Sequence, residues 1–400
     1  MWRVPAVLCM GAGFLCCTEP AITSSPASVM STPDIRRSKL DPSTSSASNQ
    51  PTLPTNSMRL SNSKRPPKPF NHSDLMSFQA THMGTTFEIQ VRTTREDANV
   101  GAVVSEAFEA IAKVEELMSE WKPNSEISRV NRNAGRKATR VSEATMKVLS
   151  AALNIASKSK GAFDPTWAIF RDVWRFDQKP ARRPERTDIE RARALVDYRK
   201  LHLALDARTA RLAREKMVIG LGAIAKGFAI DEAARILRQY GYENFIIDGG
   251  GDLYLGGRPS PTRKWSISIR HPRRTHESMG TIEVENAAVV TSGDYERYFS
   301  HGGERYHHII DVRTGYPARG AVAITLVFPQ AMTADALATA AFVLNSADTQ
   351  KMFTHFPAAK WLIFRPDGSI EQNGTDNWVK LTRKTWKPYT SLDGGTPDDL

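Results

Sequence analysis

The stretch HHIIDVRTGYP, residues 307–317, combines two adjacent histidines, an acid, an arginine and a Thr-Gly pair. A core strand rarely carries so many titratable and turn-forming groups, so we interpret it as a strand that runs into a functional site. In a regular strand successive side chains point to opposite faces, so only one of His307 and His308 can face that site. We favour His308. Taken alone, residues 311–315 also fit a simple turn closed by a side-chain hydrogen bond.

The basic charge of the chain is unevenly distributed. The net charge of +11 would, on its own, fit a nucleic-acid-binding protein. The excess lies mostly within residues 36–68 and 179–193, and neither stretch carries regularly interleaved aromatic residues. Such charge runs usually belong to linkers and solvated surfaces, or attract a segment to anionic lipid. We therefore expect no nucleic-acid partner.

The first residues have the pattern of an export signal. Arg3 provides a basic start, and the apolar run at residues 4–15 is too short to span a bilayer. We predict a signal peptide at residues 1–17, with Cys16 or Cys17 as the lipidated cysteine of a lipoprotein. The usual small residue before that cysteine is missing, so a plain secretory signal is the alternative. The expected location is the periplasm, with a lipid anchor in the inner membrane.

Composition divides the remaining chain into three parts. Residues 18–75 are rich in Ser, Thr, Pro and Asn and cannot bury enough apolar surface to fold, so we predict a disordered linker. Residues 76–385 form the predicted folded domain, and residues 386–400 a polar tail. All three cysteines precede residue 20, which excludes a disulfide framework, a Cys-ligated metal and a cysteine nucleophile in the folded part.

Hydrophobic periodicity predicts both helices and strands. Apolar residues recur every three to four positions in four predicted helices, at residues 97–118, 142–157, 228–240 and 332–344. A hairpin is predicted at residues 78–92, and further strands at 245–248, 265–270, 288–291, 309–311, 321–328 and 361–364. Residues 175–195 are polar and basic, which predicts a surface excursion. The predicted fold class is α/β, in the mixed α+β sense.

Two glycine-rich segments could bring the backbone close to a ligand. Residues 219–227, IGLGAIAKG, match the Gly-x-Gly-x-x-Gly/Ala fingerprint of dinucleotide-binding folds, and a predicted helix follows. The strand before them is short and regular βα alternation is missing, which weakens an oxidoreductase reading. A helix N-terminus would still favour phosphate. Residues 248–252, DGGGD, fit either a tight turn or close approach to a cofactor.

Asp335 and Thr339 lie four residues apart in a segment of small and apolar residues. On a helix they share one face, one turn apart. A buried acid needs a partner, because an unpaired buried charge is costly. Mg²⁺ fits, since it takes carboxylate and hydroxyl oxygens and often a phosphate. The alternative is an acid that interacts only with the dipole of its helix.

Together these segments resemble, in order, the motifs of the ApbE family of FAD:protein FMN transferases. The resemblance covers about residues 78–365 and implies an ApbE/T-fold-like flavin transferase domain. The matching motifs are MGT at 83–85, SEWKPNSEISRVN at 119–131, GAFDPT at 161–166, the 219–227 segment, SGDY at 292–295, HHIIDVRTGYP at 307–317 and the Asp335–Thr339 pair.

The resemblance also implies roles for individual residues. FAD would be lined by Met83, Trp121, Ala162, Phe163, Asp164, Gly220, Lys226 and Ile309. Mg²⁺ would be held by the carbonyl oxygen of Ala223 with Asp335 and Thr339. The chain departs from the family pattern at three positions: Gly220 stands where the family commonly has an acid, Ala338 where some members have a second metal acid, and Val312 where a proline is usual.

The activity that the resemblance implies is phosphotransferase-type: Mg²⁺-dependent transfer of the FMN moiety of FAD, a substrate here, to a threonine hydroxyl of an acceptor protein, with release of AMP. The implied acceptor is a membrane redox protein. His308 is the expected base, because a hydroxyl needs one at neutral pH. Asp311 would orient His308 or join the metal-side network. An FAD pyrophosphatase and a non-catalytic periplasmic FAD-binding lipoprotein are the alternatives.

Overall fold

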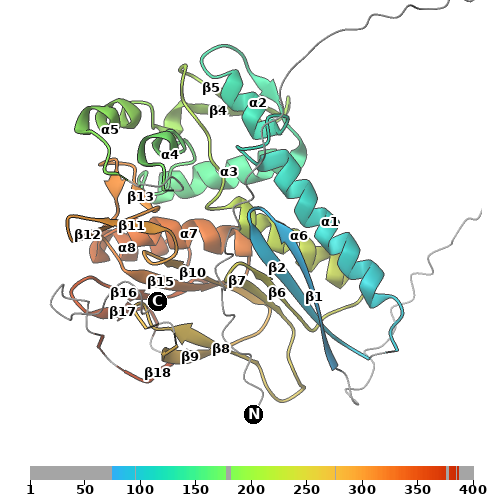
Figure 1. Cartoon of the computed structure of the whole chain (residues 1–400). Coiled ribbons are helices and arrows are strands. Elements are labelled where there is room, and N and C mark those ends of the chain that lie inside the picture. The colour runs from blue at the N-terminus through green and yellow to red at the C-terminus, as the bar shows by residue number, and fades with distance from the viewer. Residues whose placement is uncertain are drawn as a thin grey trace, which may run out of the picture. The chain divides into compact units, whose positions relative to one another are not determined.

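The computed structural model describes residues 74–386, except residues 95, 177–181, 275, 375–377 and 384 (Figure 1). The predicted signal peptide, nearly all of the predicted linker and the tail beyond Trp386 lie outside the described residues. Trp386, the first residue of the predicted tail, is buried, and its ring meets that of Phe364 edge-on at 6.4 Å.

An eight-stranded sheet forms the centre of the described fold, in the order β1-β2-β6-β7-β10-β15-β16-β17. Its strands are β1 Asp74–His82, β2 Thr85–Thr93, β6 Phe245–Gly249, β7 Asp252–Gly256, β10 Ala287–Gly293, β15 Ala323–Phe328, β16 Lys360–Phe364 and β17 Ile370–Gln372. Every neighbouring pair is antiparallel. A Rossmann dinucleotide-binding fold needs parallel strands, so the fold suggested by the glycine fingerprint is wrong for this chain.

The alternation of side chains along the strands divides the interior into two cores. In β6, Phe245 and Ile247 belong to one core and Ile246 to the other; in β16, Ile363 and Phe364 are divided in the same way. This follows from the two-residue period of a strand whose two faces are both buried. The second core is closed by a smaller sheet of β8 Trp265–Arg270, β9 Ser278–Val284 and β18 Val379–Leu381.

Helices cover the core that contains Phe245 and Ile247, on the face of the large sheet that the smaller sheet does not cover (Figure 1). They are α1 Val100–Met118, α6 Ala225–Gln239 and α7 Ala331–Val343. A side chain at Gly227 in α6 would collide with the carbonyl oxygen of Ala331, so the two helices approach at backbone distance and only glycine fits there. No helix within the described ranges has the length and apolar character needed to cross a bilayer.

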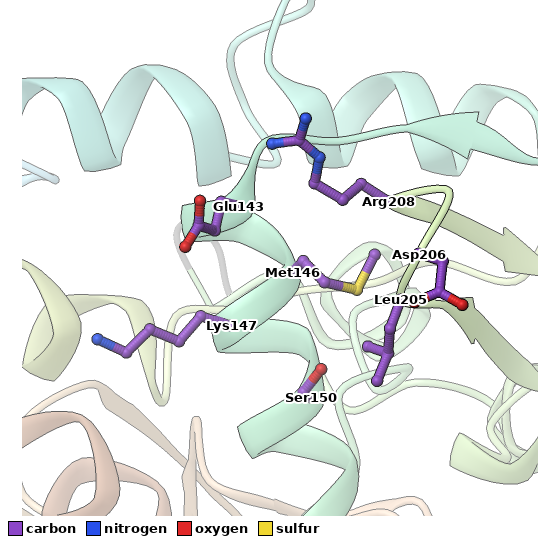
Figure 2. A pocket seen from close by; sticks show the side chains of 7 residues that line it. All are labelled: Glu143, Met146, Lys147, Ser150, Leu205, Asp206 and Arg208. Carbon is purple, nitrogen blue, oxygen red and sulfur yellow. The ribbon is translucent and has the colours of Figure 1, made fainter.

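A helical and β-hairpin layer packs beyond α1 and α7. It contains α2 Glu126–Arg132, α3 Glu143–Lys158, the 3₁₀ turn η1 Tyr198–Lys200, and a small sheet of β3 Thr139–Arg140, β5 Thr209–Leu212 and β4 Leu201–Ala204. Between α3 and the β4–β5 loop lies a hollow of about 450 Å³, which Figure 2 shows with its lining residues. Glu143, Lys147, Asp206 and Arg208 give this hollow both signs of charge, so it favours no single class of ligand.

A third apolar cluster holds the segment around residues 307–317. Its elements are α4 Ile169–Trp174, α5 Arg186–Arg193, β11 Tyr298–His301, β12 Glu304–His307, β13 Ile310–Asp311 and β14 Tyr316–Pro317. Trp174 stacks on Tyr306, with ring centroids 5.7 Å apart. The predicted surface excursion at 175–195 therefore needs correction: it contains α5, whose Ile189 and Ala192 are buried in this cluster.

The mixed α+β class predicted from the sequence is confirmed. The four predicted helices correspond to α1, α3, α6 and α7, and the predicted hairpin to β1 and β2. The other predicted strands correspond to β6, β8, β10, β13, β15 and β16. Not predicted were α2, α4, α5, α8 Ser346–Phe353 and several short strands.

Candidate functional site

The turn that follows His308 depends on its glycine. Gly315 has a φ of +81°, in the left-handed region that favours glycine. A Cβ atom there would also lie 2.5 Å from Ile189 and 3.0 Å from Phe170. The indole nitrogen of Trp174 donates a hydrogen bond to the carbonyl of Gly315 at 2.9 Å. The third apolar cluster therefore holds this turn in place, through Phe170 and Trp174 of α4 and Ile189 of α5.

Asp311 closes the same turn through its backbone and its side chain. Its carbonyl oxygen accepts hydrogen bonds from the amides of Thr314 and Gly315, at 3.0 and 2.7 Å. Its carboxylate accepts from Arg313: from the amide at 3.0 Å, Nε at 2.8 Å and Nη2 at 2.9 Å. Within the described ranges no hydrogen bond joins it to His308, so its role beside that histidine stays a prediction.

The two histidines lie in different surroundings. His307 is 2% exposed; its Nε2 lies 2.8 Å from the carbonyl oxygen of Ala318, and its ring meets Phe342 edge-on. His308 is half-buried, and its Nδ1 lies 3.3 Å from the carbonyl oxygen of Arg297. A carbonyl can only accept, so Nδ1 carries the proton and Nε2 keeps its lone pair. His308 is therefore the histidine that could take a proton from a ligand.

Electrostatics keep His308 neutral. Burial, together with the smaller effects of His307, Arg297 and Lys226, lowers its pKa to about 4. The hydrogen bond to the Arg297 carbonyl acts in the opposite direction. A neutral imidazole at physiological pH is a proton acceptor, as a general base must be.

Lys226, Asp252 and Asp335 form a charged cluster at the start of α6. Lys226 Nζ forms an ion pair with the carboxylate of Asp252, which is 3% exposed. Burial lowers the pKa of Lys226, but the charges of Asp252, Asp335 and Asp248 outweigh this, so the pKa is raised overall and the ammonium stays charged. The charge of Lys226 also contributes to the lowered pKa of His308.

Asp335 is the acid of this cluster that a cation would satisfy. It is 5% exposed, and its Oδ2 accepts a hydrogen bond from the amide of Gly227 at 3.1 Å. Burial, reinforced by Asp252, raises its pKa to about 7. Thr339 lies one turn further along α7, and Ala223 lies in the loop before α6; both are half-buried. Carboxylate, hydroxyl and carbonyl oxygens form a donor set that fits Mg²⁺.

The predicted metal ligands Ala223, Asp335 and Thr339 do not form a cluster of carboxylates or histidines. Among the residues that the structure describes, no group of three or more His, Cys, Asp and Glu is placed to hold a metal ion. The set at Asp335 contains one carboxylate, so a bound cation would need further oxygens from a ligand. Phosphate oxygens are the usual partners of Mg²⁺ in such sites.

Burial and hydrogen bonds fix the segment 162–164, which is predicted to line FAD. The side chains of Ala162 and Phe163 are buried. Asp164 accepts hydrogen bonds from the amide and hydroxyl of Thr166, at 2.8 and 2.6 Å, and from the amide of Tyr198 at 2.8 Å. Burial raises its pKa, against the effect of these bonds. The amides of Ala162 and Phe163 bond to the carbonyl and hydroxyl oxygens of Ser159, both at 3.1 Å, so contact of this segment with FAD stays a prediction.

The remaining predicted FAD residues lie on separate loops. Met83 has a φ of +52° in the β1–β2 turn, and its amide donates to Glu115 at 3.0 Å. Ile309 is 7% exposed, next to His308. At Gly220, an added Cβ would lie 2.7 Å from the Cβ of Ala168, so a larger residue would require the neighbouring segment of the chain to shift. Trp121, by contrast, is 67% exposed.

Sequence reasoning missed three charged residues near these segments. Asp252 ends the DGGGD segment and pairs with Lys226, and the signal was a second acid beside three glycines. Glu120 and Arg171 form an ion pair beside Trp121, with 3.3 Å between Nη1 and Oε1. No local pattern joins Glu120 to Arg171, because the fold alone brings their segments together.

Comparison with known proteins gives consistent matches over the described domain. The model of the ApbE family matches residues 83–362. A Treponema pallidum protein named FAD:protein FMN transferase is 33% identical over 303 residues, which are 72% of this chain and 84% of that protein. A Haemophilus influenzae protein of the same name is 31% identical over 317 residues, or 77% and 92% of the two chains.

Solved structures match as well. The ApbE protein of Thermotoga maritima has a TM-score of 0.69 at 32% identity, covering 76% of this chain and 98% of that one. The flavin transferase ApbE of Vibrio cholerae has a TM-score of 0.68 at 26% identity, covering 77% and 99%.

The fold and the site define a mixed α+β protein in which Lys226, at the start of α6, pairs with Asp252, and the next residue, Gly227, donates its amide to the buried Asp335 of α7. With the family model matching most of its length, this chain belongs to the ApbE family.

Proposed function

We propose that this chain is an FAD:protein FMN transferase, which moves the FMN moiety of FAD to a threonine hydroxyl of an acceptor protein and releases AMP. The observation that carries the proposal is the arrangement at the start of α6, where Lys226 pairs with Asp252 and the amide of Gly227 donates to the buried Asp335 at 3.1 Å. The names of the Treponema and Haemophilus relatives support the same reaction.

The proposed reaction needs one proton transfer and one exchange of phosphorus–oxygen bonds. The threonine oxygen attacks the FMN phosphorus, the bond from that phosphorus to the bridging oxygen breaks, and AMP leaves with the electron pair. His308 takes the hydroxyl proton at Nε2, because its Nδ1 is directed to the Arg297 carbonyl. Lys226 stays charged and attracts the pyrophosphate.

We propose that the reaction depends on Mg²⁺, held by Asp335, Thr339 and the carbonyl oxygen of Ala223. When bound there, the cation would neutralise pyrophosphate charge and act as a Lewis acid. The protein's contribution is the fixed spacing of α6 and α7, since the amide of Gly227 binds Asp335 at 3.1 Å and prevents the acid from turning away.

One assay separates this proposal from its alternatives. The protein is incubated with FAD, Mg²⁺ and a threonine-containing acceptor peptide, and products are analysed by mass spectrometry. Peptide-bound FMN with free AMP is expected. Free FMN and AMP without labelled peptide would indicate an FAD pyrophosphatase, and unchanged FAD would indicate a binding protein.

The acceptor and location are further proposals that rest on the N-terminal sequence and the family. We propose that the protein is exported and anchored through Cys16 or Cys17, facing the periplasm, and that its acceptor is a membrane redox protein in the same compartment. A tether at the membrane would raise the local concentration of such an acceptor.

A further inference from the structure

Trp121 is a large aromatic residue on the surface of this domain. Its side chain is 67% exposed, although burying so much apolar area is favourable. It lies in the connection between α1 and α2, where the hydroxyl of Ser119 accepts hydrogen bonds from the amides of Trp121 and Lys122, at 3.2 and 3.3 Å. The backbone that carries the indole is therefore fixed, while most of its ring surface is accessible.

Arg171 of α4 covers one face of this indole. Its guanidinium carbon lies 3.9 Å from the ring centroid of Trp121, within the range of a cation–π contact. The Arg171 side chain is 21% exposed, and its Nε and Nη1 are buried without a hydrogen-bond partner among the described residues. The guanidinium therefore stacks on the indole of Trp121, while its Nε and Nη1 make no hydrogen bond to the described residues.

Glu120 fixes Arg171 and a third segment. Its Oε1 lies 3.3 Å from Arg171 Nη1, and its side chain is 11% exposed. Burial raises its pKa, while the charge of Arg171 and a hydrogen bond from the Leu221 amide lower it. Leu221 belongs to the loop that precedes α6. Glu120 therefore joins the Trp121 loop to α4, and its pKa also responds to the Leu221 amide in the loop that carries Ala223.

We propose that the Glu120–Arg171 pair is a positioning device: it holds Trp121 with one indole face on the guanidinium and presents the other face to the flat isoalloxazine ring of a flavin. The ligand class rests on the proposed function. Arg171 and Glu120 do not touch the flavin themselves. A ring that is already fixed loses little conformational freedom on binding, which favours affinity.

The first experiment compares ligands that contain or lack the flavin ring. Arg171→Met removes the guanidinium at similar length, Arg171→Lys keeps the charge without the planar group, and Arg191→Met on α5 is the matched control, from an exposed pair with Asp188. With FAD and riboflavin as probes, Arg171→Met should raise Kd about fivefold, or about 1 kcal/mol, with a smaller rise for Arg171→Lys. Binding of ADP should not change; an equal rise for ADP would contradict the proposal.

A double-mutant cycle separates positioning from general damage to the fold. If Arg171 acts through Trp121, adding Arg171→Met to Trp121→Ala should not weaken FAD binding further. Additive losses would overturn the proposal. Removing one member of a buried pair leaves the other charge unpaired, so the neutral pair Glu120→Gln with Arg171→Met is the second variant if the single one does not fold.

A ligand-free measurement keeps the test independent of the proposed function. The chain has 8 tryptophans, so 5-fluorotryptophan labelling gives resolvable ¹⁹F signals, and Trp121→Phe assigns the one for Trp121. Arg171→Met should move and broaden that signal, whereas Arg191→Met should not. An unchanged Trp121 signal would overturn the positioning role. A moved signal in a protein that binds no FAD would refute only the proposed function and the flavin ligand.

Discussion

His308 shows how a single residue is prepared for its proposed role. Its Nδ1 is directed to the Arg297 carbonyl, and burial keeps the ring neutral. We expect His308→Ala to lower the rate of FMN transfer by about 10²–10⁴-fold, the usual contribution of a general base. FAD affinity should stay within about twofold, because the base acts mainly in the transition state. His301→Ala, an exposed histidine of β11, is the control; equal rates for wild type and His308→Ala would reject the assignment.

The lowered pKa of His308 predicts that activity persists to a lower pH than an ordinary histidine would allow. An ordinary histidine loses its base form below its pKa of 6.5, but the pKa of His308 is lowered to about 4, so it stays unprotonated through mildly acidic pH. At saturating Mg²⁺, which would keep Asp335 ionised, kcat/KM should fall with a midpoint near pH 4. This ratio reports groups of the free enzyme. Circular dichroism at each pH controls for unfolding, and a midpoint at 6.5 would contradict the prediction.

Asp335 permits a test of the metal site without turnover. Asp335→Asn keeps an acceptor for the Gly227 amide but removes the charge. Affinity for Mn²⁺, measured by electron paramagnetic resonance without FAD, should fall at least about 10-fold, since loss of even an outer partner of a metal ligand costs that much. The folded state should persist, because burial of this charge is costly. Asp188→Asn on α5 is the control, and unchanged Mn²⁺ affinity would refute the metal role.

The residues of the site were partly predictable. His308 and Asp335 are conspicuous, since a titratable group among apolar neighbours is visible in one segment. The partner of Lys226 was not predictable, because Lys226 lies in α6 and Asp252 begins β7, where it looks like part of a turn. The same holds for Glu120 and Arg171. Ion pairs between distant elements form only when the chain folds. The sequence therefore contains the residues but does not show which of them pair.

At the scale of elements, the β11–β12 and β13–β14 turns offer a matched pair of glycines, Gly303 and Gly315. Gly315 and Gly303 have nearly equal φ angles, +81° and +80°, but only Gly315 has neighbours in the path of a Cβ atom. Gly303→Ala should cost about 1–2 kcal/mol of unfolding free energy from backbone strain. Gly315→Ala should cost about 1–3 kcal/mol more, from overpacking against Ile189 and Phe170. Urea unfolding of both variants measures the difference; equal costs would show that packing at Gly315 is relaxed.

Elements were predictable where their periodicity was long. The helix α1 places Val104, Ile111 and Val114 on one buried face, as its pattern predicts. The helix α5 was missed because only Ile189 and Ala192 are buried among basic residues. Two apolar positions are too few to establish a period. Short strands such as β3 were missed because their partner lies far away in the sequence: Thr139 and Arg140 pair with Ala210 and Thr209 of β5.

At the scale of the whole molecule, export and anchoring remain to be tested in cells. If Cys16 or Cys17 is lipidated, palmitate labelling of the full chain should be lost in one of Cys16→Ser and Cys17→Ser and kept in the other. The protein should move from the membrane fraction to the soluble periplasm with it. Cys9→Ser, within the predicted signal, is the control. Membrane retention without label would point to another means of attachment.

The fold class was predictable because the pattern mixes helical and strand periods, but the antiparallel order of the sheet was not. Residues 219–227 look like a dinucleotide fingerprint, yet the strands around them pair antiparallel. The spacing of glycines indicates only that the backbone approaches another group closely. Strand direction is decided by connections between distant segments.

The two-core sheet limits how this chain can change over time. Phe245 and Ile247 lie in the helical core and Ile246 in the other, so one inserted or deleted residue in β6 would exchange their environments. It would also shift the glycines at 249–251, and with them Asp252, relative to Lys226. Natural length variation should therefore accumulate in connections such as 257–264, while β6 keeps its length even in distant descendants.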